Sequence, residues 1–111
     1  MIDLGKKMNK FGLSKHIVTQ ICDIFKKYPS VHKVFIFGSR ATNLYRDNSD
    51  IDLVFFGDDN LSQDLKKISI DLEDTTIPYL FDLVDYTEVK DLEFKSSIDR
   101  ESQFFYIKRN I

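Results

Sequence analysis

The sequence predicts an α/β (α+β) fold, a small mixed β-sheet flanked by helices, in a single domain over residues 1–111. Short apolar runs that suit buried strands alternate along the chain with longer segments whose apolar residues recur every three or four positions. The connections between these segments are short, and no repeat or low-complexity linker separates them. The length allows one hydrophobic core. This order of elements favours a layered sandwich around one sheet.

The chain begins with a lead and a helix. Residues 1–13 have mixed charge and no sustained period, so we expect a loosely ordered lead. Ser14 is a favourable helix N-cap, and the apolar residues that follow it keep helical spacing until Pro29. These signals predict a helix over about 15–28.

The middle of the chain contains two strands and two helices. The apolar run at 33–37 predicts a strand that leads into a short helix after Ser39. A second strand is predicted at 51–56, before a plain turn signal. Spacings of three and four between apolar residues then predict a helix over about 61–74, with a charged outer face.

Three further elements complete the predicted fold. Pro78 separates the preceding helix from a third strand at 80–84. A last helix is predicted at 89–97, and a short closing strand at 103–107. The full order is helix, strand, helix, strand, helix, strand, helix and strand.

The most specific signal is a glycine-serine turn followed by two aspartates. Gly38 and Ser39 lie where a strand ends and a helix begins, and backbone amides there favour a phosphate. Asp50 and Asp52 share one face of the next strand, where they could hold one hard cation. The sequence favours two interpretations of Arg40 equally. It could contact a triphosphate, or it could be an exposed arginine at the start of a helix.

This combination resembles the signature of the nucleotidyltransferase superfamily related to DNA polymerase beta, and in a chain of this length it most resembles the minimal nucleotidyltransferase (MNT) family. The resemblance covers residues 14–107. The segment 81–85 is similar to the family strand that supplies a third carboxylate. The segment 97–101 and the apolar run 104–107 are similar to the closing helix and strand of that family.

The resemblance implies a two-metal site for nucleotide transfer. Asp50 and Asp52 would bridge two Mg²⁺ ions, and Asp82 would be the third ligand, nearest the acceptor hydroxyl. Ser39 and the amides around Gly38 would hold the β- and γ-phosphates of ATP.

The choice of the third carboxylate also has an argument from geometry. Asp82 and Asp85 are separated by an odd number of positions, so in a strand they face opposite sides of the sheet. Only one of them can join the cluster, and Asp82 matches the family pattern.

The resemblance further implies a biological role. Small MNT chains are often encoded beside a HEPN-domain ribonuclease toxin, which implies an antitoxin that transfers AMP from ATP to a toxin tyrosine in a hetero-oligomer. Two alternatives stay open. One is a nucleotidyltransferase acting on a small-molecule acceptor, and the other is a non-catalytic antitoxin that neutralises its partner by binding.

Composition excludes several other classes of protein. A balance of 16 basic against 18 acidic residues argues against broad nucleic-acid binding. The single Cys22 cannot form an internal disulfide, which fits a reducing compartment and makes the cytoplasm the expected location. No segment approaches the ~18 apolar residues of a membrane span. A Walker-type phosphate loop is missing, which argues against a P-loop ATPase.

Overall fold

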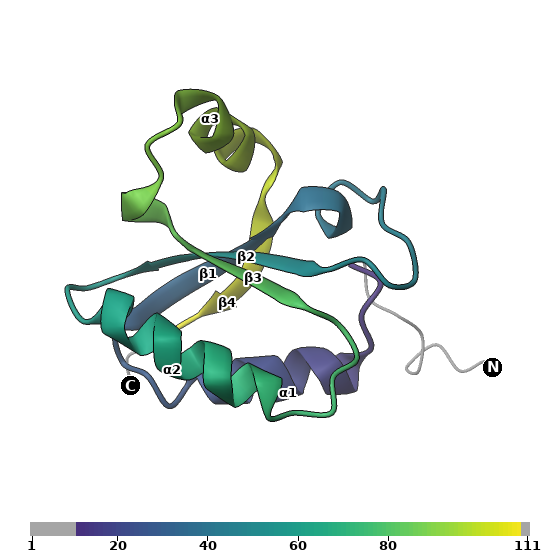
Figure 1. Ribbon diagram of the computed structural model, residues 1–111, viewed down its shortest axis with the longest axis horizontal. Coiled ribbons are helices and arrows are strands. Elements are labelled where there is room, and N and C mark those ends of the chain that lie inside the picture. Colours follow the sequence, from purple (N-terminus) through teal and green to yellow (C-terminus); the bar gives the residue numbers. More distant parts are fainter. Residues whose placement is uncertain (1–10, 110–111) are drawn as a thin grey trace.

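The computed structural model describes residues 11–109 and shows helices on both sides of one sheet (Figure 1). The elements are, in chain order, α1 (Lys15–Phe25), β1 (Val31–Phe37), the 3-10 turn η2 (Gly38–Arg40), β2 (Ile51–Gly57), α2 (Leu61–Glu73), β3 (Phe81–Asp85), the 3-10 turn η3 (Tyr86–Glu88), α3 (Leu92–Glu101) and β4 (Gln103–Ile107). Within this part of the chain, every helix is too short or too polar to cross a membrane.

The four strands form one mixed sheet in the order β3-β2-β1-β4. β1 lies antiparallel to both β2 and β4, whereas β2 and β3 are parallel. A parallel pair needs a crossover connection, and α2 provides it. The predicted small mixed sheet is therefore confirmed, and β3 and β4 form its two edges.

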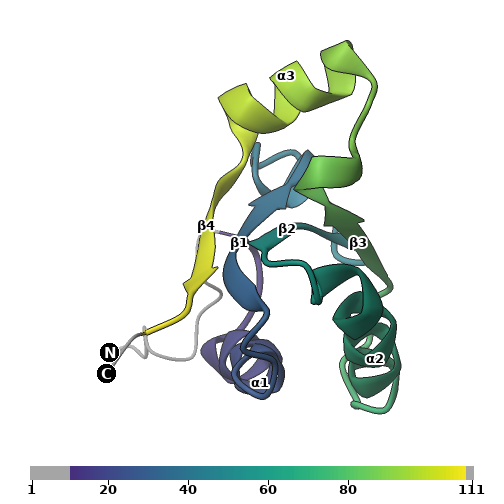
Figure 2. The same ribbon diagram turned by 90° about the vertical axis from the view of Figure 1, so that its left-hand side faces the viewer.

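The two faces of the sheet are covered unequally. In Figure 2, α1 and α2 lie on one side of the sheet and α3 lies on the other. Because successive strand residues point to opposite faces, Leu53 and Phe55 join the larger core with α1 and α2. Asp52 and Val54 point to the α3 side, where Ile98 of α3 packs in a smaller cluster. The carboxylate of Asp52 therefore lies on the face with the thinner cover.

The larger core extends to the start of the described chain. Phe11 and Leu13 are both buried, with exposed fractions of 5% and 0%. The expectation of a loose lead over residues 1–13 is therefore wrong for these last positions, because their side chains fill core volume. Residues 1–10 lie outside the described part of the chain.

The first helix ends earlier than its apolar pattern predicts. α1 stops at Phe25, and the next turn closes through tighter bonds, from the Lys27 amide to the Ile24 carbonyl and from the Tyr28 amide to the Phe25 carbonyl. The predicted end at 28 is three residues too late. Side chains in such a turn point in nearly the same directions as in an α-helix, so the apolar pattern continues past the true end.

The last helix begins later than predicted. Tyr86–Glu88 form η3, and α3 starts at Leu92 rather than at residue 89. The Asp91 side chain accepts hydrogen bonds from the Glu93 and Phe94 amides, which defines the N-cap. Asp91 is a favourable N-cap residue and marks this start in the sequence. The apolar Val89 led to the earlier start in the prediction.

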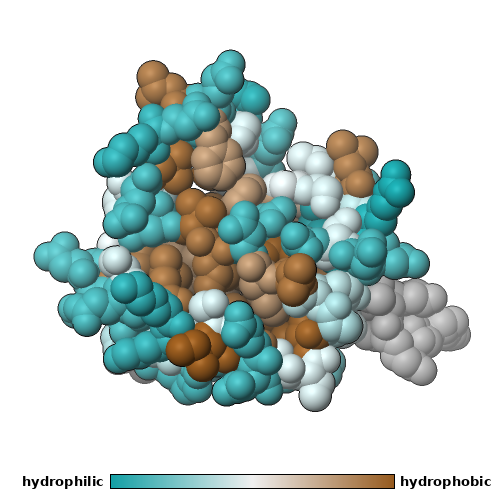
Figure 3. Space-filling view, in the orientation of Figure 1, coloured by the Kyte–Doolittle hydropathy of each residue, from teal (hydrophilic) through white to brown (hydrophobic). Residues whose placement is uncertain are grey.

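Apolar surface gathers in the middle of one side of the molecule. Figure 3 shows it between α3 at the top and α2 at the bottom.

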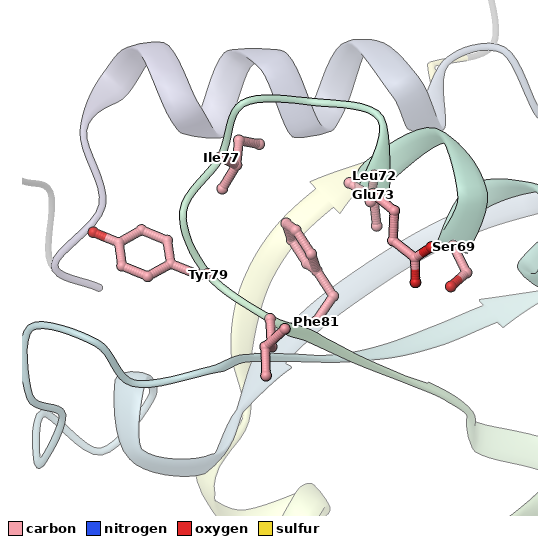
Figure 4. A pocket seen from close by; sticks show the side chains of 7 residues that line it. Ser69, Leu72, Glu73, Ile77, Tyr79 and Phe81 are labelled. Atoms are coloured by element: carbon pink, nitrogen blue, oxygen red, sulfur yellow. The ribbon is translucent and has the colours of Figure 1, made fainter.

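A pocket of about 240 Å³ lies behind edge strand β3 (Figure 4). Its lining comes from the second half of α2, from the segment before β3 and from the first residue of β3: Ser69, Leu72, Glu73, Ile77, Tyr79, Leu80 and Phe81.

Candidate active site

The glycine-serine turn packs directly against one of the predicted aspartates. Gly38 has φ 75°, a left-handed conformation that favours glycine. A Cβ atom at this position would collide with Oδ2 of Asp52. The Ala41 amide donates to the Gly38 carbonyl at 3.0 Å, so the predicted short helix after the strand is a single 3-10 turn. The glycine therefore permits a contact that any side chain would prevent.

The sheet register brings two carboxylates side by side. In the parallel pair of β2 with β3, Asp52 lies beside Asp82. On its other side, Asp52 lies beside Phe37, the last residue of β1. Asp85 lies beside Phe55 instead, and its side chain accepts hydrogen bonds from the Thr87 amide and hydroxyl. The structure thus places Asp82 next to Asp52 and uses Asp85 as a cap for η3.

Asp52 has a strongly perturbed environment. Burial is the largest cause, followed by the neighbouring charges of Asp82 and Asp50, and together they raise the pKa of Asp52 to about 6. The positive charge of Arg40 acts in the opposite direction. Asp50 and Asp82 are exposed. The charges of Asp50 and Asp82 therefore act on Asp52, and a cation beside Asp52 would relieve this repulsion.

The donor set fits Mg²⁺ as an open site. Among residues 11–109, no three histidine, cysteine or acidic side chains are gathered closely enough to form a complete ligand cage. Mg²⁺ is usually held by one or two carboxylates, with waters and substrate phosphates completing its coordination. Asp52 and Asp82 lie side by side in the sheet and supply two such carboxylates. Asp50 precedes β2, and the structure does not gather it with them into a group of three.

Ser39 lies in the turn beside Gly38 and is half-buried. Its carbonyl accepts the Leu44 amide at 2.9 Å, which draws the following loop back over the turn. The hydroxyl of Thr42 lies 3.4 Å from the carbonyls of both Gly38 and Ser39. The predicted phosphate-binding turn is thus held by the loop that follows it.

Arg40 is not the exposed arginine that one interpretation of the sequence expects. Its side chain is 1% exposed, so it does not face solvent. The guanidinium donates to the carbonyls of Phe11, Gly12 and Ser49. The reading of Arg40 as an exposed arginine is therefore wrong, and its contact to a nucleotide stays a prediction.

Two tyrosines near Arg40 were missed by the sequence analysis. The centre of the guanidinium lies 4.5 Å from the ring centroid of Tyr79 and 5.3 Å from that of Tyr45. Both tyrosines lie in irregular segments, where hydrophobic periodicity gives no information. Tyr45 is an aromatic residue in a polar loop, and Tyr79 follows Pro78 in an apolar stretch.

Comparison with protein families decides the relationship of this chain. The model of the polymerase beta nucleotidyltransferase family matches residues 19–110. The chain belongs to this family. The predicted relationship to the DNA polymerase beta-like superfamily is thereby confirmed, and family membership supports nucleotidyl transfer as the general activity.

Solved structures share the fold of this polymerase beta nucleotidyltransferase family member. A toxin-antitoxin complex with AMP-PNP matches with a TM-score of 0.63 and 18% identity, over 83% of this chain and 74% of the other. A protein assigned as a nucleotidyltransferase from Sulfolobus solfataricus matches with a TM-score of 0.53 and 22% identity, over 84% and 78%. No curated protein matches significantly. At these identities the likeness concerns the fold.

Proposed function

We propose that this protein is a Mg²⁺-dependent adenylyltransferase that transfers AMP from ATP to a hydroxyl of a partner protein. The observation that carries the proposal is the register of Asp52 with Asp82, beside a turn whose Gly38 contacts Asp52. Family membership supports the reaction class. The AMP-PNP in the toxin-antitoxin neighbour, an analogue of ATP, supports adenine nucleotide as the donor.

The proposed roles follow from position. Asp50, Asp52 and Asp82 would hold two Mg²⁺ ions, which when bound activate the attacking hydroxyl and neutralise the leaving pyrophosphate. Ser39 and the amides around Gly38 would bind the β- and γ-phosphates. Asp82 is exposed on an edge strand and would lie nearest the acceptor.

The proposed reaction is an in-line displacement at the α-phosphorus of ATP. The acceptor oxygen forms the new P–O bond, the bond to the pyrophosphate oxygen breaks, and pyrophosphate leaves. The hydroxyl loses its proton, and the exposed carboxylate of Asp82 would receive it. Charge that develops on the phosphates would be stabilised by the amides of the turn.

A protein acceptor is favoured over a small molecule by the openness of the site. Asp50 and Asp82 are both exposed, whereas sites for small molecules are usually concave and enclose most of the ligand. The apolar surface between α3 and α2 offers further contact area for a protein (Figure 3). We propose that the acceptor is a tyrosine of a HEPN-domain ribonuclease toxin, that this protein is its antitoxin, and that the two form a hetero-oligomer in the cytoplasm, where ATP and Mg²⁺ are present.

Intact mass spectrometry tests this proposal. The protein encoded by the adjacent gene is incubated with this protein, ATP and Mg²⁺, beside an Asp50→Ala/Asp52→Ala control. A gain of one or more AMP units that is absent from the control is the expected result, and fragmentation then gives the acceptor residue. A stable complex with unchanged mass would instead support a non-catalytic antitoxin. The absence of both complex and mass change would favour a small-molecule acceptor.

A further inference from the structure

The buried guanidinium of Arg40 joins chain segments that are far apart in the sequence. Nη1 donates to the Phe11 carbonyl at 3.0 Å and to the Gly12 carbonyl at 3.3 Å. Nη2 and Nε both donate to the Ser49 carbonyl, at 2.8 and 3.2 Å. One side chain therefore ties the segment before α1 to the residue that precedes Asp50.

The two ring contacts of Arg40 add a third and a fourth attachment. Tyr45 belongs to the loop between η2 and β2, and Tyr79 belongs to the segment that leads into β3. Figure 4 shows the Tyr79 ring turned away from Phe81. A guanidinium over an aromatic ring is attracted to it, and the attraction is stronger where water is excluded. The segment that carries Asp82 is thereby linked to the same cation.

The carbonyls that Arg40 satisfies explain why a charge is tolerated in this interior. A buried charge is costly unless its donors are paired, and buried backbone carbonyls in irregular segments also need partners. Arg40 meets both needs at once. Its planar fork reaches acceptors in two directions, which the single ammonium group of a lysine cannot reproduce.

We propose that Arg40 is a positioning residue that fixes the phosphate-binding turn and the two acidic segments relative to one another. It projects from the turn itself, one residue after Ser39, and holds Ser49 and Tyr79 by its head group. Its effect on transfer rests on the proposed function. Its effect on how firmly the loops are held is independent of that function.

Three variants test the proposal. Arg40→Met removes the charge and the donors but keeps much of the side-chain volume, and Arg40→Lys keeps the charge without the fork. Arg46→Met is the matched control, because Arg46 is an exposed arginine in the same loop. All measurements are made at a temperature at which circular dichroism shows each variant to be folded. If Arg40→Met does not fold, the same measurements on Arg40→Lys test the proposal.

Amide hydrogen exchange reports on positioning without any need for activity. The informative amides are those of Leu44, Ser49 and Ile51, which donate to the carbonyls of Ser39, Arg46 and Leu80. We expect exchange at these amides to accelerate at least about tenfold in Arg40→Met and less in Arg40→Lys, with exchange in α2 unchanged. A uniform acceleration over all helices, or no change at the three amides, would overturn the proposal.

AMP transfer gives the second readout. Misplacement of reacting groups by about 1 Å can cost on the order of 100-fold in rate, so Arg40→Met should lose about that much while Arg46→Met stays within about threefold of the original protein. A folded Arg40→Met with full activity would overturn the catalytic part of the proposal. If the unmodified protein transfers no AMP at all, the proposed function fails, and hydrogen exchange still decides the role of Arg40.

Discussion

At the scale of single residues, Asp52 is the group whose environment opposes folding most clearly. Burial and two neighbouring aspartates raise its pKa to about 6 from an ordinary 3.8. A carboxyl whose pKa is higher in the folded state destabilises that state when it is ionised. The unfavourable contribution is therefore present above about pH 6 and disappears as the pH falls towards 4.

Replacing Asp52 by asparagine should stabilise the metal-free protein. Asp52→Asn keeps the shape of the side chain and removes its charge, so we expect a gain of about 1 kcal/mol at pH 8, after allowance for solvent screening of a half-exposed group. Urea denaturation in the presence of a chelator measures it. The gain should shrink as the pH falls below 6 and vanish only below the ordinary value near 3.8, and a loss of stability at pH 8 would contradict this account.

The control for that experiment lies on the neighbouring strand. Asp85 accepts two hydrogen bonds from Thr87, so Asp85→Asn removes a favourable interaction rather than a repulsive charge. It should not stabilise the protein at pH 8. An equal gain in both variants would point to the net charge of the molecule instead of the local cluster around Asp52.

Gly38 gives a second prediction at this scale. Gly38→Ala places a Cβ atom at φ 75° and against Oδ2 of Asp52, so both backbone strain and a collision result. We expect a loss of about 1–3 kcal/mol in unfolding free energy, together with loss of the proposed transfer. Ser39→Ala is the control, since it should change stability by less than about 0.5 kcal/mol. If Gly38→Ala unfolds at the same midpoint urea concentration as the original protein, the predicted strain is absent.

At the scale of elements, the starts of α2 and α3 differ in a way that can be measured. Asp91 caps α3 through bonds to two amides, whereas Asn60 at the start of α2 makes no side-chain cap bond. Asp91→Ala should therefore cost about 1 kcal/mol, and Asn60→Ala should cost less than about 0.5 kcal/mol. Chemical denaturation of both variants compares them directly. Equal losses would show that the capping bond of Asp91 contributes nothing in solution.

The types and order of the helices and strands could be predicted from the sequence because hydrophobic periodicity reflects burial. The ends of several elements could not. α1 ends three residues early through tight turns, and α3 starts only after η3, where Val89 gave a misleading apolar signal. Element ends depend on local hydrogen bonds such as that of Asp91, which periodicity does not record.

At the scale of the whole molecule, stability should depend on pH in two opposite ways. Among the described residues, Asp52 and Asp71 are the carboxyl groups with clearly shifted pKa values. The Tyr28 hydroxyl and Lys27 lower the pKa of Asp71, so its contribution is present above its ordinary value near 3.8 and is lost as the pH falls further. Protonation of Asp52 increases the stability of the folded protein as the pH falls from about 6 to about 4.

These opposite contributions predict a stability maximum for the metal-free protein at about pH 4, because the gain from Asp52 continues down to the ordinary pKa of an aspartate and the loss from Asp71 begins there. Millimolar Mg²⁺ should move the maximum towards neutral pH, because the proposed site binds the cation when its carboxyl groups are ionised. Thermal denaturation from about pH 3 to 8, with chelator and with Mg²⁺, checks both statements. Magnesium-free buffer with NaCl added to the same ionic strength provides the control. A maximum that Mg²⁺ does not move would count against metal binding at this site.

The candidate site could be predicted only in part. The glycine-serine turn and the acidic pairs stand out in the sequence, and strand parity already separated Asp82 from Asp85. The buried role of Arg40 could not be predicted, because it depends on carbonyls and rings from segments on either side of the turn. Family resemblance identifies motif residues, and the three-dimensional structure is needed to show what surrounds them.

The position of β1 in the sheet has a consequence for synthesis of the protein. This central strand pairs with β2 soon after it in the chain, but its other neighbour is β4, Gln103–Ile107. A ribosome that has made residue 85 has already made every proposed ligand, yet β1 still lacks one of its two neighbouring strands. The nascent chain therefore cannot complete this fold until residue 107 has been translated, and the proposed transfer requires the folded sheet.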